Sequence, residues 1–195
     1  MRTIKKMQGG TFCDTKEYII DTARSLFSEY SYPGVSMGDI AKKLNITKAA
    51  LYYHFTGKAE IYIEVLDKAF DNLDLFISKA FNEKTVERKL YKLIKNYLDF
   101  GLKEKNLVKS VMLKLSPANS QIKKRVVQLK KQRMALIYPV IKEMSINKKI
   151  VRKIDNKLLT SLLIGMMDGL ILEYSLLDKK INSSKVADQI VTVLF

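Results

Sequence analysis

Apolar residues recur along most of the chain at spacings of three and four, which is the period of amphipathic helices. The first such segment begins at about Thr15 and places five apolar residues on one face: Ile19, Ile20, Ala23, Leu26 and Phe27. Tyr32-Pro33-Gly34 then interrupts the pattern. No sustained alternation of apolar and polar residues predicts a strand. The pattern therefore predicts an all-α protein.

Interruptions of this pattern divide the rest of the chain into further predicted helices. These predicted helices span about residues 37–44, 48–54, 58–81, 85–104, 106–115, 120–144, 155–178 and 184–194. Pro139 lies inside one of them, and we expect it to kink that helix or to end its regular part. Two of the predicted helices, at about 37–44 and 48–54, are short, and most of those that follow are longer.

Residues 35–55 carry the signals of two short helices joined by a tight turn. Ser36 is placed to cap the first of these helices, and Thr47 the second. Asn45 follows the last turn of the first helix, where a left-handed residue is needed and Asn is tolerated. The first helix has an apolar inner face made of Ile40, Ala41 and Leu44.

The second helix of this pair has one apolar face and one polar, aromatic face. Leu51 and Phe55 lie one turn apart and face the predicted core. Two further pairs, also one turn apart, face outward: Lys48 with Tyr52, and Ala49 with Tyr53. This arrangement predicts a DNA-binding helix-turn-helix over about 36–55.

The charge of the chain favours an anionic partner. Its 195 residues include 35 Lys or Arg and 20 Asp or Glu, a net charge of +15, which points to nucleic acid first and to a membrane surface second. The excess lies mainly in the middle, because residues 84–157 hold 21 basic and 5 acidic residues, whereas residues 1–58 hold 9 and 5. Charge alone therefore does not identify the function.

Composition excludes several classes of protein. A single cysteine, Cys13, and a single histidine, His54, exclude an internal disulfide and a His/Cys metal site. No catalytic set or glycine-rich phosphate loop is present, so we expect neither an enzyme nor a cofactor. The basic residues near the N-terminus precede no apolar run, which excludes a secretory signal. The apolar stretch Leu158–Leu172 is interrupted and shorter than the ~20 residues of a membrane span, so we expect a cytoplasmic protein without one.

The residues around the helix-turn-helix resemble the DNA-binding head of the TetR family of bacterial regulators. The resemblance rests on Leu51-Tyr52-Tyr53-His54-Phe55, followed by Lys58 and preceded by Asp39-Ile40-Ala41 and Thr47-Lys48. It covers about Thr15 to Leu66, and the rest of the chain resembles the family in length and helical character only. Met37 departs from it, since many members carry there a small hydroxyl residue that touches phosphate. The resemblance implies a three-helix DNA-binding head with the helix-turn-helix at 1–57, and a larger C-terminal helical bundle for effector binding and dimerisation at 58–195.

The resemblance implies a homodimer that binds an operator on double-stranded DNA. The two recognition helices, at about 48–54, would enter successive major grooves. Lys48 and Ala49 would approach base edges, where an ammonium donates to guanine acceptors and a methyl group touches thymine. The Lys48 ammonium suits a phosphate equally well, and Tyr52 would reach a base or a sugar.

The resemblance also implies phosphate contacts for three residues further along the chain, which are Tyr53, His54 and Lys58. Tyr53 and His54 would donate to phosphates, with packing and a structural role as the respective alternatives. Lys58 would add a positive charge at the start of the next helix. The complete implied DNA-binding set is Ser36, Met37, Gly38, Thr47, Lys48, Ala49, Tyr52, Tyr53, His54 and Lys58.

The resemblance also implies a small-molecule effector inside the second domain. Large apolar and aromatic residues with a few hydroxyl groups suit a moderately hydrophobic ligand. The candidate lining residues are Phe70, Tyr97, Phe100, Met112, Met134, Tyr138, Met167 and Tyr174. Asp99 and Asp168 lie in apolar helical contexts and favour a neutral or cationic compound, while the basic surroundings leave an anion open.

The dimer interface is expected on the last two predicted helices. Leu158–Leu177 is apolar around most of its circumference, so this helix has to bury more than one face. A stripe on the last helix would complete a four-helix bundle across a two-fold axis. The candidate interface residues are Leu162, Gly165, Gly169, Leu172, Val186, Ile190, Val193 and Leu194.

These observations predict a transcriptional repressor that a small-molecule effector releases from a palindromic operator. The alternative is a basic helical protein that binds membrane or nucleoid surfaces without operator recognition. That alternative explains the charge but not the helix-turn-helix.

Overall fold

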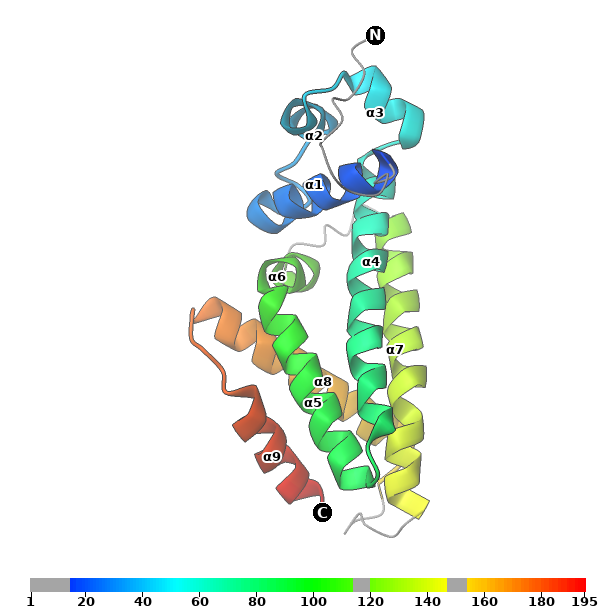
Figure 1. The fold of residues 1–195 in the computed structure, drawn as a ribbon, viewed down its shortest axis with the longest axis vertical. Helices are drawn as coiled ribbons and strands as arrows, with labels where there is room; N and C mark the ends of the chain where they lie inside the picture. The colour runs from blue at the N-terminus through cyan, green and yellow to red at the C-terminus, as the bar shows by residue number, and fades with distance from the viewer. Residues whose placement is uncertain (1–14, 114–119, 147–153) are drawn as a thin grey trace, which may run out of the picture.

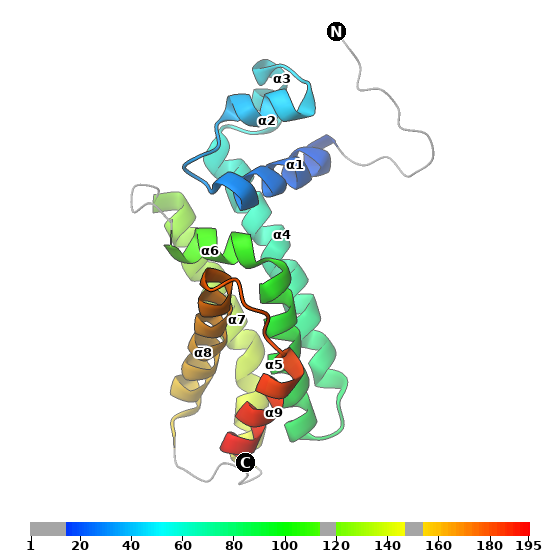
Figure 2. The same cartoon turned by 90° about the vertical axis from the view of Figure 1, so that its left-hand side faces the viewer.

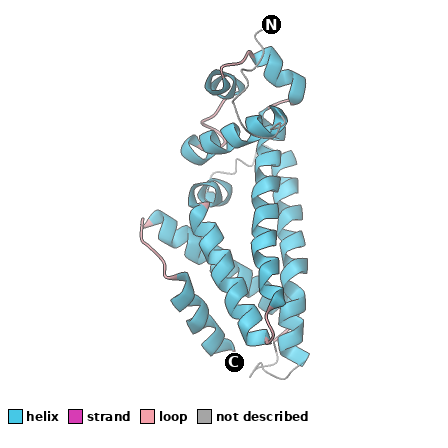
Figure 3. Cartoon of the chain, viewed as in Figure 1, coloured by secondary structure: helices cyan, strands magenta, loops and turns pink. Residues whose placement is uncertain are grey.

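A computed structural model of the chain describes residues 15–113, 120–146 and 154–195, which form helices and no strand (Figures 1 and 3). The helices are α1 Thr15–Tyr30, α2 Met37–Leu44, α3 Lys48–His54, α4 Lys58–Ser78, the 3-10 turn η1 Lys79–Asn82, α5 Val86–Lys103, α6 Lys105–Leu113, α7 Ser120–Ile146, α8 Asn156–Leu176 and α9 Ser183–Leu194. The prediction of an all-α protein is confirmed for the described residues.

Two predicted helices differ from the observed ones. The span 58–81 is not one α-helix, because η1 forms its last turn. Pro139 does not end α7, which continues for a further seven residues. Its ring removes one backbone donor, but Ile137 and Ile141 on either side are fully buried and hold both halves of the helix in the core.

The first three helices form a head at one end of an elongated molecule (Figure 1). From this head α4 runs to the opposite end, side by side with α7. Helix α5 packs along α4, and α6 crosses beneath α1 (Figure 2). Helix α8 packs on α5, α6 and α7, and α9 covers α5 from outside. The head therefore touches the rest of the molecule through α4 and α6.

The buried core of the head continues into the second domain. The cluster that holds the inner faces of α1, α2 and α3 also contains Leu107 of α6 and three residues of α7, namely Ile122, Val126 and Leu129. The expected domain boundary at 57/58 falls at the start of α4. Apolar packing crosses that boundary, so the core of the head is shared with α4, α6 and α7.

A second cluster fills the space between α4, α5, α7, α8 and α9. Helices α5 and α8 approach each other closely at Gly101 of α5, where an added Cβ atom would meet Cδ1 of Ile171 on α8. A side chain at this position would overlap the isoleucine. The missing side chain therefore sets how closely α5 and α8 approach.

Among the described helices, α8 is the one that is long and apolar enough to cross a membrane by length and composition. The expectation that this stretch is too short for a span is wrong on that count, because the helix has 21 residues. Core helices of soluble proteins satisfy the same test. One side of α8 is buried in the second cluster through Leu159, Leu163, Met167 and Ile171.

Gly101→Ala is expected to lower the free energy of unfolding by about 1–3 kcal/mol, because the added methyl group overlaps Ile171. Ile171→Val removes the Cδ1 atom and costs about 0.5–1.5 kcal/mol by itself. The double variant is expected to lose less stability than the two single losses combined. Urea denaturation measures all three variants. Strictly additive losses would show that the two residues are not in contact.

Candidate DNA interface and ligand cavity

Helix α2 begins at a reciprocal cap formed by Ser36 and Asp39. The Ser36 hydroxyl oxygen accepts a hydrogen bond from the Asp39 amide at 3.1 Å, and the Ser36 amide donates to Oδ2 of Asp39 at 2.8 Å. The Ser36 hydroxyl also donates to Oδ2 at 2.6 Å. These bonds lower the pKa of the Asp39 carboxyl below its ordinary value. The cap is therefore charged at neutral pH and holds the first turn of α2.

A left-handed residue turns the chain between α2 and α3. Asn45 has φ 55° and ψ 41°, and its amide donates to the carbonyl of Ala41. The Ile46 amide donates to the same carbonyl at 3.0 Å. Thr47 Oγ1 accepts from the Ala50 amide at 3.1 Å and caps α3. The turn and both caps are as the sequence predicts.

The outer face of α3 is open to solvent. Lys48 and Ala49 are exposed at the start of the helix. Tyr52 is 53% exposed and Tyr53 is 87% exposed. The His54 ring is half-buried and meets the Tyr53 ring edge-on, with 5.2 Å between ring centroids. The fold thus brings five of the predicted DNA-binding residues onto one short helix.

One predicted DNA-binding residue at the start of α2 is not on the surface. The two capping residues, Ser36 before α2 and Thr47 before α3, are exposed, but the Met37 side chain is buried in the core of the head. Met37 is therefore not available as a side-chain contact to phosphate, because its apolar side chain packs inward. Gly38 faces Lys48: a Cβ atom there would lie 3.0 Å from Cε of the lysine. The missing side chain leaves room for the lysine between the two helices.

Lys58 starts α4, but its ammonium points toward the head. The Nζ atom donates to the carbonyl oxygens of Tyr32 and Val35, at 2.9 and 2.7 Å, and lies 4.4 Å from the centroid of the Tyr32 ring. Burial lowers the pKa of Lys58, and the negative charge of Asp39 opposes this shift. In this structure the ammonium anchors the segment before α2 to α4. The expected role therefore changes from a phosphate contact to a structural one.

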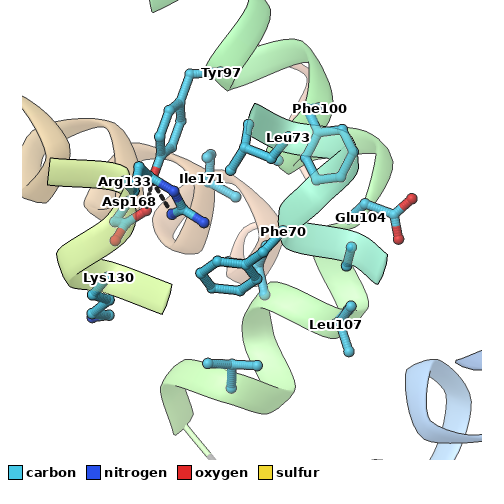
Figure 4. A pocket seen from close by; sticks show the side chains of 14 residues that line it. Phe70, Leu73, Tyr97, Phe100, Glu104, Leu107, Lys130, Arg133, Asp168 and Ile171 are labelled. Carbon is cyan, nitrogen blue, oxygen red and sulfur yellow. Dashed lines mark hydrogen bonds between the residues drawn. The ribbon is translucent and has the colours of Figure 1, made fainter. Parts of the chain in front are cut away.

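The second domain contains a largely apolar cavity of about 60 Å³ between α4, α5, α6, α7 and α8 (Figure 4). Three predicted lining residues border it: Phe70, Tyr97 and Phe100. Four do not: Met134, Tyr138, Met167 and Tyr174. The Met112 side chain lies outside the described part of the chain. Helix rotation explains two of the misses, because the neighbours Arg133 and Asp168, about 100° further round their helices, do border the cavity.

Three polar side chains form a hydrogen-bonded chain in the cavity wall. The Arg133 Nη1 donates to the Tyr97 hydroxyl at 2.7 Å, and that hydroxyl donates to Oδ1 of Asp168 at 2.6 Å (Figure 4). Burial raises the pKa of Tyr97, so its hydroxyl stays protonated. Asp99 is not in the cavity; its carboxylate pairs with Lys95 at the surface. Of the two acids that favoured a cationic ligand, Asp99 thus lies outside the cavity, and Asp168 lines the cavity but accepts the Tyr97 hydroxyl.

Sequence reasoning missed three charged residues of the cavity wall, which are Glu104, Lys130 and Arg133. Charged residues on amphipathic helices ordinarily face solvent. A signal was present for Arg133, which stands between Leu129 and Ile137 on the apolar stripe of α7 at the i, i+4 spacing.

The predicted interface residues of α8 lie on an uncovered apolar face. Leu162 is 55% exposed, Leu172 is half-buried, and both Gly165 and Gly169 are exposed. A Cβ atom at either glycine would have no described heavy atom within 4 Å. The described residues of the protomer therefore leave this face open.

The predicted stripe of α9 is arranged differently. Val186, Ile190 and Leu194 pack against the second cluster of their own chain, because α9 lies on α5. Val193 is 84% exposed. Most of this stripe is therefore partly covered within the protomer, and its role in a dimer stays a prediction.

Two family models match the chain. The model for bacterial regulatory proteins of the tetR family matches residues 19–65, which include α2, α3 and most of α1. The model for the C-terminal region of YsiA-like proteins matches residues 67–195. The two matches together cover the head and the whole second domain.

Individual proteins agree with this. The biofilm operon icaADBC HTH-type negative transcriptional regulator IcaR of Staphylococcus epidermidis is 34% identical over 116 residues, or 58% of this chain and 62% of IcaR. Two solved structures share the fold, each at 19% sequence identity. The transcriptional regulator FadR from Bacillus subtilis in complex with stearoyl-CoA superposes with a TM-score of 0.77 over 90% of this chain and 95% of that chain. AibR in complex with isovaleryl coenzyme A and operator DNA superposes with a TM-score of 0.74 over 92% of this chain and 97% of that chain. The family models decide the assignment: the chain belongs to the TetR family of bacterial regulatory proteins.

Proposed function

We propose that this chain is a cytoplasmic transcriptional repressor that binds a palindromic operator as a homodimer and is released by a small-molecule effector. The observation that carries the proposal is the exposed outer face of α3, held at the far end of the head by two caps and a turn (Figure 1). Footprinting tests it. A repressor protects one short near-palindromic site, whereas a basic protein that binds membrane or nucleoid surfaces protects none.

Helix α3 is proposed to enter the major groove. Lys48 and Ala49, at its exposed start, are placed for guanine acceptors and a thymine methyl group. Tyr52 lies one turn further on, within reach of a base or a sugar. The Tyr53 hydroxyl and the His54 ring are proposed to donate to phosphates, which position the helix without reading sequence.

The proposed effector is an acyl-coenzyme A ester. The FadR and AibR structures contain ligands of this class, and the apolar wall of the cavity suits an acyl chain. A cavity of about 60 Å³ has room for a few water molecules. The nucleotide part of such an ester would therefore lie outside the cavity, and a long chain would require the helices to move apart.

An ion pair links the cavity to the head. Arg24 of α1 pairs with Glu104, which caps α5, and the side chains are only 22% and 12% exposed. Glu104 also borders the cavity. A ligand that displaces this carboxylate therefore acts directly on α1. We infer that this contact carries part of the coupling between effector and operator.

The homodimer is proposed to form through α8. Leu158, Leu162 and Met166 recur at every fourth residue and are 54%, 55% and 41% exposed. Gly165 and Gly169 beside them allow close approach of a second helix. An apolar stripe of this kind is self-complementary across a two-fold axis.

Lys48→Ala is expected to reduce the free energy of operator binding by about 1–3 kcal/mol through one base position, and to relax the base preference at that position. Tyr53→Phe keeps the ring and removes the hydroxyl, so it isolates one phosphate hydrogen bond and should weaken all sequences alike. Gel shifts with operator and scrambled DNA at several salt concentrations measure both. If both variants are folded, dimeric and bind like wild type, α3 is not the recognition helix.

Lys58→Ala is expected to lower the free energy of unfolding by about 1–3 kcal/mol, because two carbonyls lose a charged donor. Lys42→Ala, an exposed lysine of α2, is the control and should leave stability unchanged. Urea denaturation compares them. Suppose instead that the Lys58 variant is as stable as wild type and that the slope of its log operator affinity against log salt concentration is smaller by about one unit. The ammonium would then be a phosphate ligand.

Arg24→Ala is expected to leave effector binding intact and to reduce the effect of the effector on operator affinity by several-fold. The probe is octanoyl-coenzyme A, and operator affinity is measured with and without it. Arg88→Ala breaks an exposed pair with Glu83 at the opposite end of α5 and serves as the control. If the acyl compound changes operator affinity by the same factor in both variants, the Arg24–Glu104 contact does not connect the cavity to the head.

Gly169→Leu is expected to lower the dimer fraction while the protomer stays folded, because nothing in the described protomer occupies the space around a Cβ there. Ala135→Leu adds the same side chain to an exposed position of α7 and is the control. Light scattering at micromolar concentration gives the mass of each. A dimeric Gly169 variant would move the interface away from this face of α8.

A further inference from the structure

Arg133 is the one charged side chain that is buried among the described residues. Its residue surface is only 5% exposed. The guanidinium carbon lies 4.2 Å from the centroid of the Phe70 ring and 5.2 Å from that of Tyr97. Two aromatic rings therefore fix the guanidinium in the wall of the cavity (Figure 4).

The hydrogen bonds of this guanidinium are incomplete. Nη1 donates to the Tyr97 hydroxyl, but Nε is buried and has no partner among the described residues. None of the ion pairs between described residues involves Arg133. A buried donor without an acceptor costs about 1–3 kcal/mol, and more when it is charged. The site therefore lacks an acceptor.

The acids closest to this network do not supply that acceptor. Asp168 accepts the Tyr97 hydroxyl, not the arginine. Asp74 on α4 has a buried carboxylate oxygen without a described partner. Burial raises the pKa of Asp74, while the charge of Arg133 acts in the opposite direction and that of Asp71 adds to the rise. The positive charge of Arg133 is thus only partly compensated.

The cavity has a polar side and an apolar side. Tyr97, Arg133, Asp168 and Lys130 lie together on one side, and the Lys130 side chain is exposed (Figure 4). The other side is formed by residues of α4, α5 and α6, with Leu73, Phe100 and Leu107 among them. Glu104 lies on that side, but Arg24 already neutralises it. The cavity matches an amphipathic molecule with one acceptor group.

We propose that Arg133 binds the carboxyl-derived oxygen of an acyl chain whose tail lies against the apolar side of the cavity. The inference rests on the proposed effector role of this cavity and names the atom that the ligand presents. A free fatty acid offers a carboxylate oxygen, and an acyl-coenzyme A ester offers a thioester carbonyl oxygen. Both accept a hydrogen bond from Nε, and both replace the missing acceptor.

Calorimetry with the full chain tests this with octanoate, octanoyl-coenzyme A and octylamine. Wild type is expected to bind at least one of the two acyl compounds at least tenfold more tightly than the cationic amine. Arg133→Met keeps an apolar side chain of similar length and is expected to weaken acyl binding about 10- to 100-fold. Lys131→Met removes one charge from the exposed side of α7 and should change the affinity less than twofold.

A second measurement does not depend on the folding of the methionine variant. The Arg133 Nε–H signal of the wild type, assigned by its absence from Arg133→Lys, is expected to shift in nuclear magnetic resonance spectra on saturation with the acyl compound. An unmoved signal at saturation overturns the proposal. So does a folded Arg133→Met variant that binds the acyl compound like wild type.

The arms of the experiment separate the two sources of the ligand. Tighter binding of octanoate identifies a free carboxylate, and tighter binding of octanoyl-coenzyme A identifies a thioester. Failure of both compounds to bind overturns the proposal. Operator binding by the wild type without ligand is measured separately, so the DNA-binding part of the proposed function stands or falls on its own result.

Discussion

The structure depends on α4 belonging to two cores at once. Its first half buries Ile61 and Val65 in the core of the head, and its second half buries Leu73 and Ile77 in the core of the second domain. The helix is continuous between them. Because a helix transmits a tilt along its length, neither end of α4 can move without the other. The packing of the second domain therefore positions the head.

Charged contacts strengthen this arrangement where α1 meets α4. Lys68 of α4 bridges Glu17 and Asp21 of α1, and Lys16 of α1 reaches Glu64 of α4. These pairs are partly exposed and contribute modestly each. The Arg24–Glu104 pair differs, since it is mostly buried and lies against the cavity. Rigid apolar packing along α4 and a breakable polar contact beside it are what a switch between two head positions requires.

The distribution of charge also fits association of two protomers. A net charge of +15 opposes dimerisation through repulsion. Much of it lies on the solvent side of α7, at exposed residues such as Lys123, Lys124 and Lys131. The uncovered face of α8, by contrast, is formed by leucine, methionine, glycine and serine, and carries no charged residue from Leu158 to Gly165. The surface proposed to meet a partner is therefore mainly apolar, while these lysines of α7 face solvent.

The sequence by itself determined the helical class, the caps at Ser36 and Thr47, the left-handed Asn45 and the outward face of α3. These features depend on residues within one or two turns of each other, so local spacing is enough to predict them. The inward Lys58 ammonium, the cavity and the coverage of α9 by its own chain depend on contacts between residues at least 23 positions apart, which no local pattern records. Arg133 shows the limit most clearly. Its place on an apolar stripe was visible in the sequence, but only the packing of α4, α5 and α8 around α7 decided that its charge is buried and that its Nε has no acceptor among the described residues.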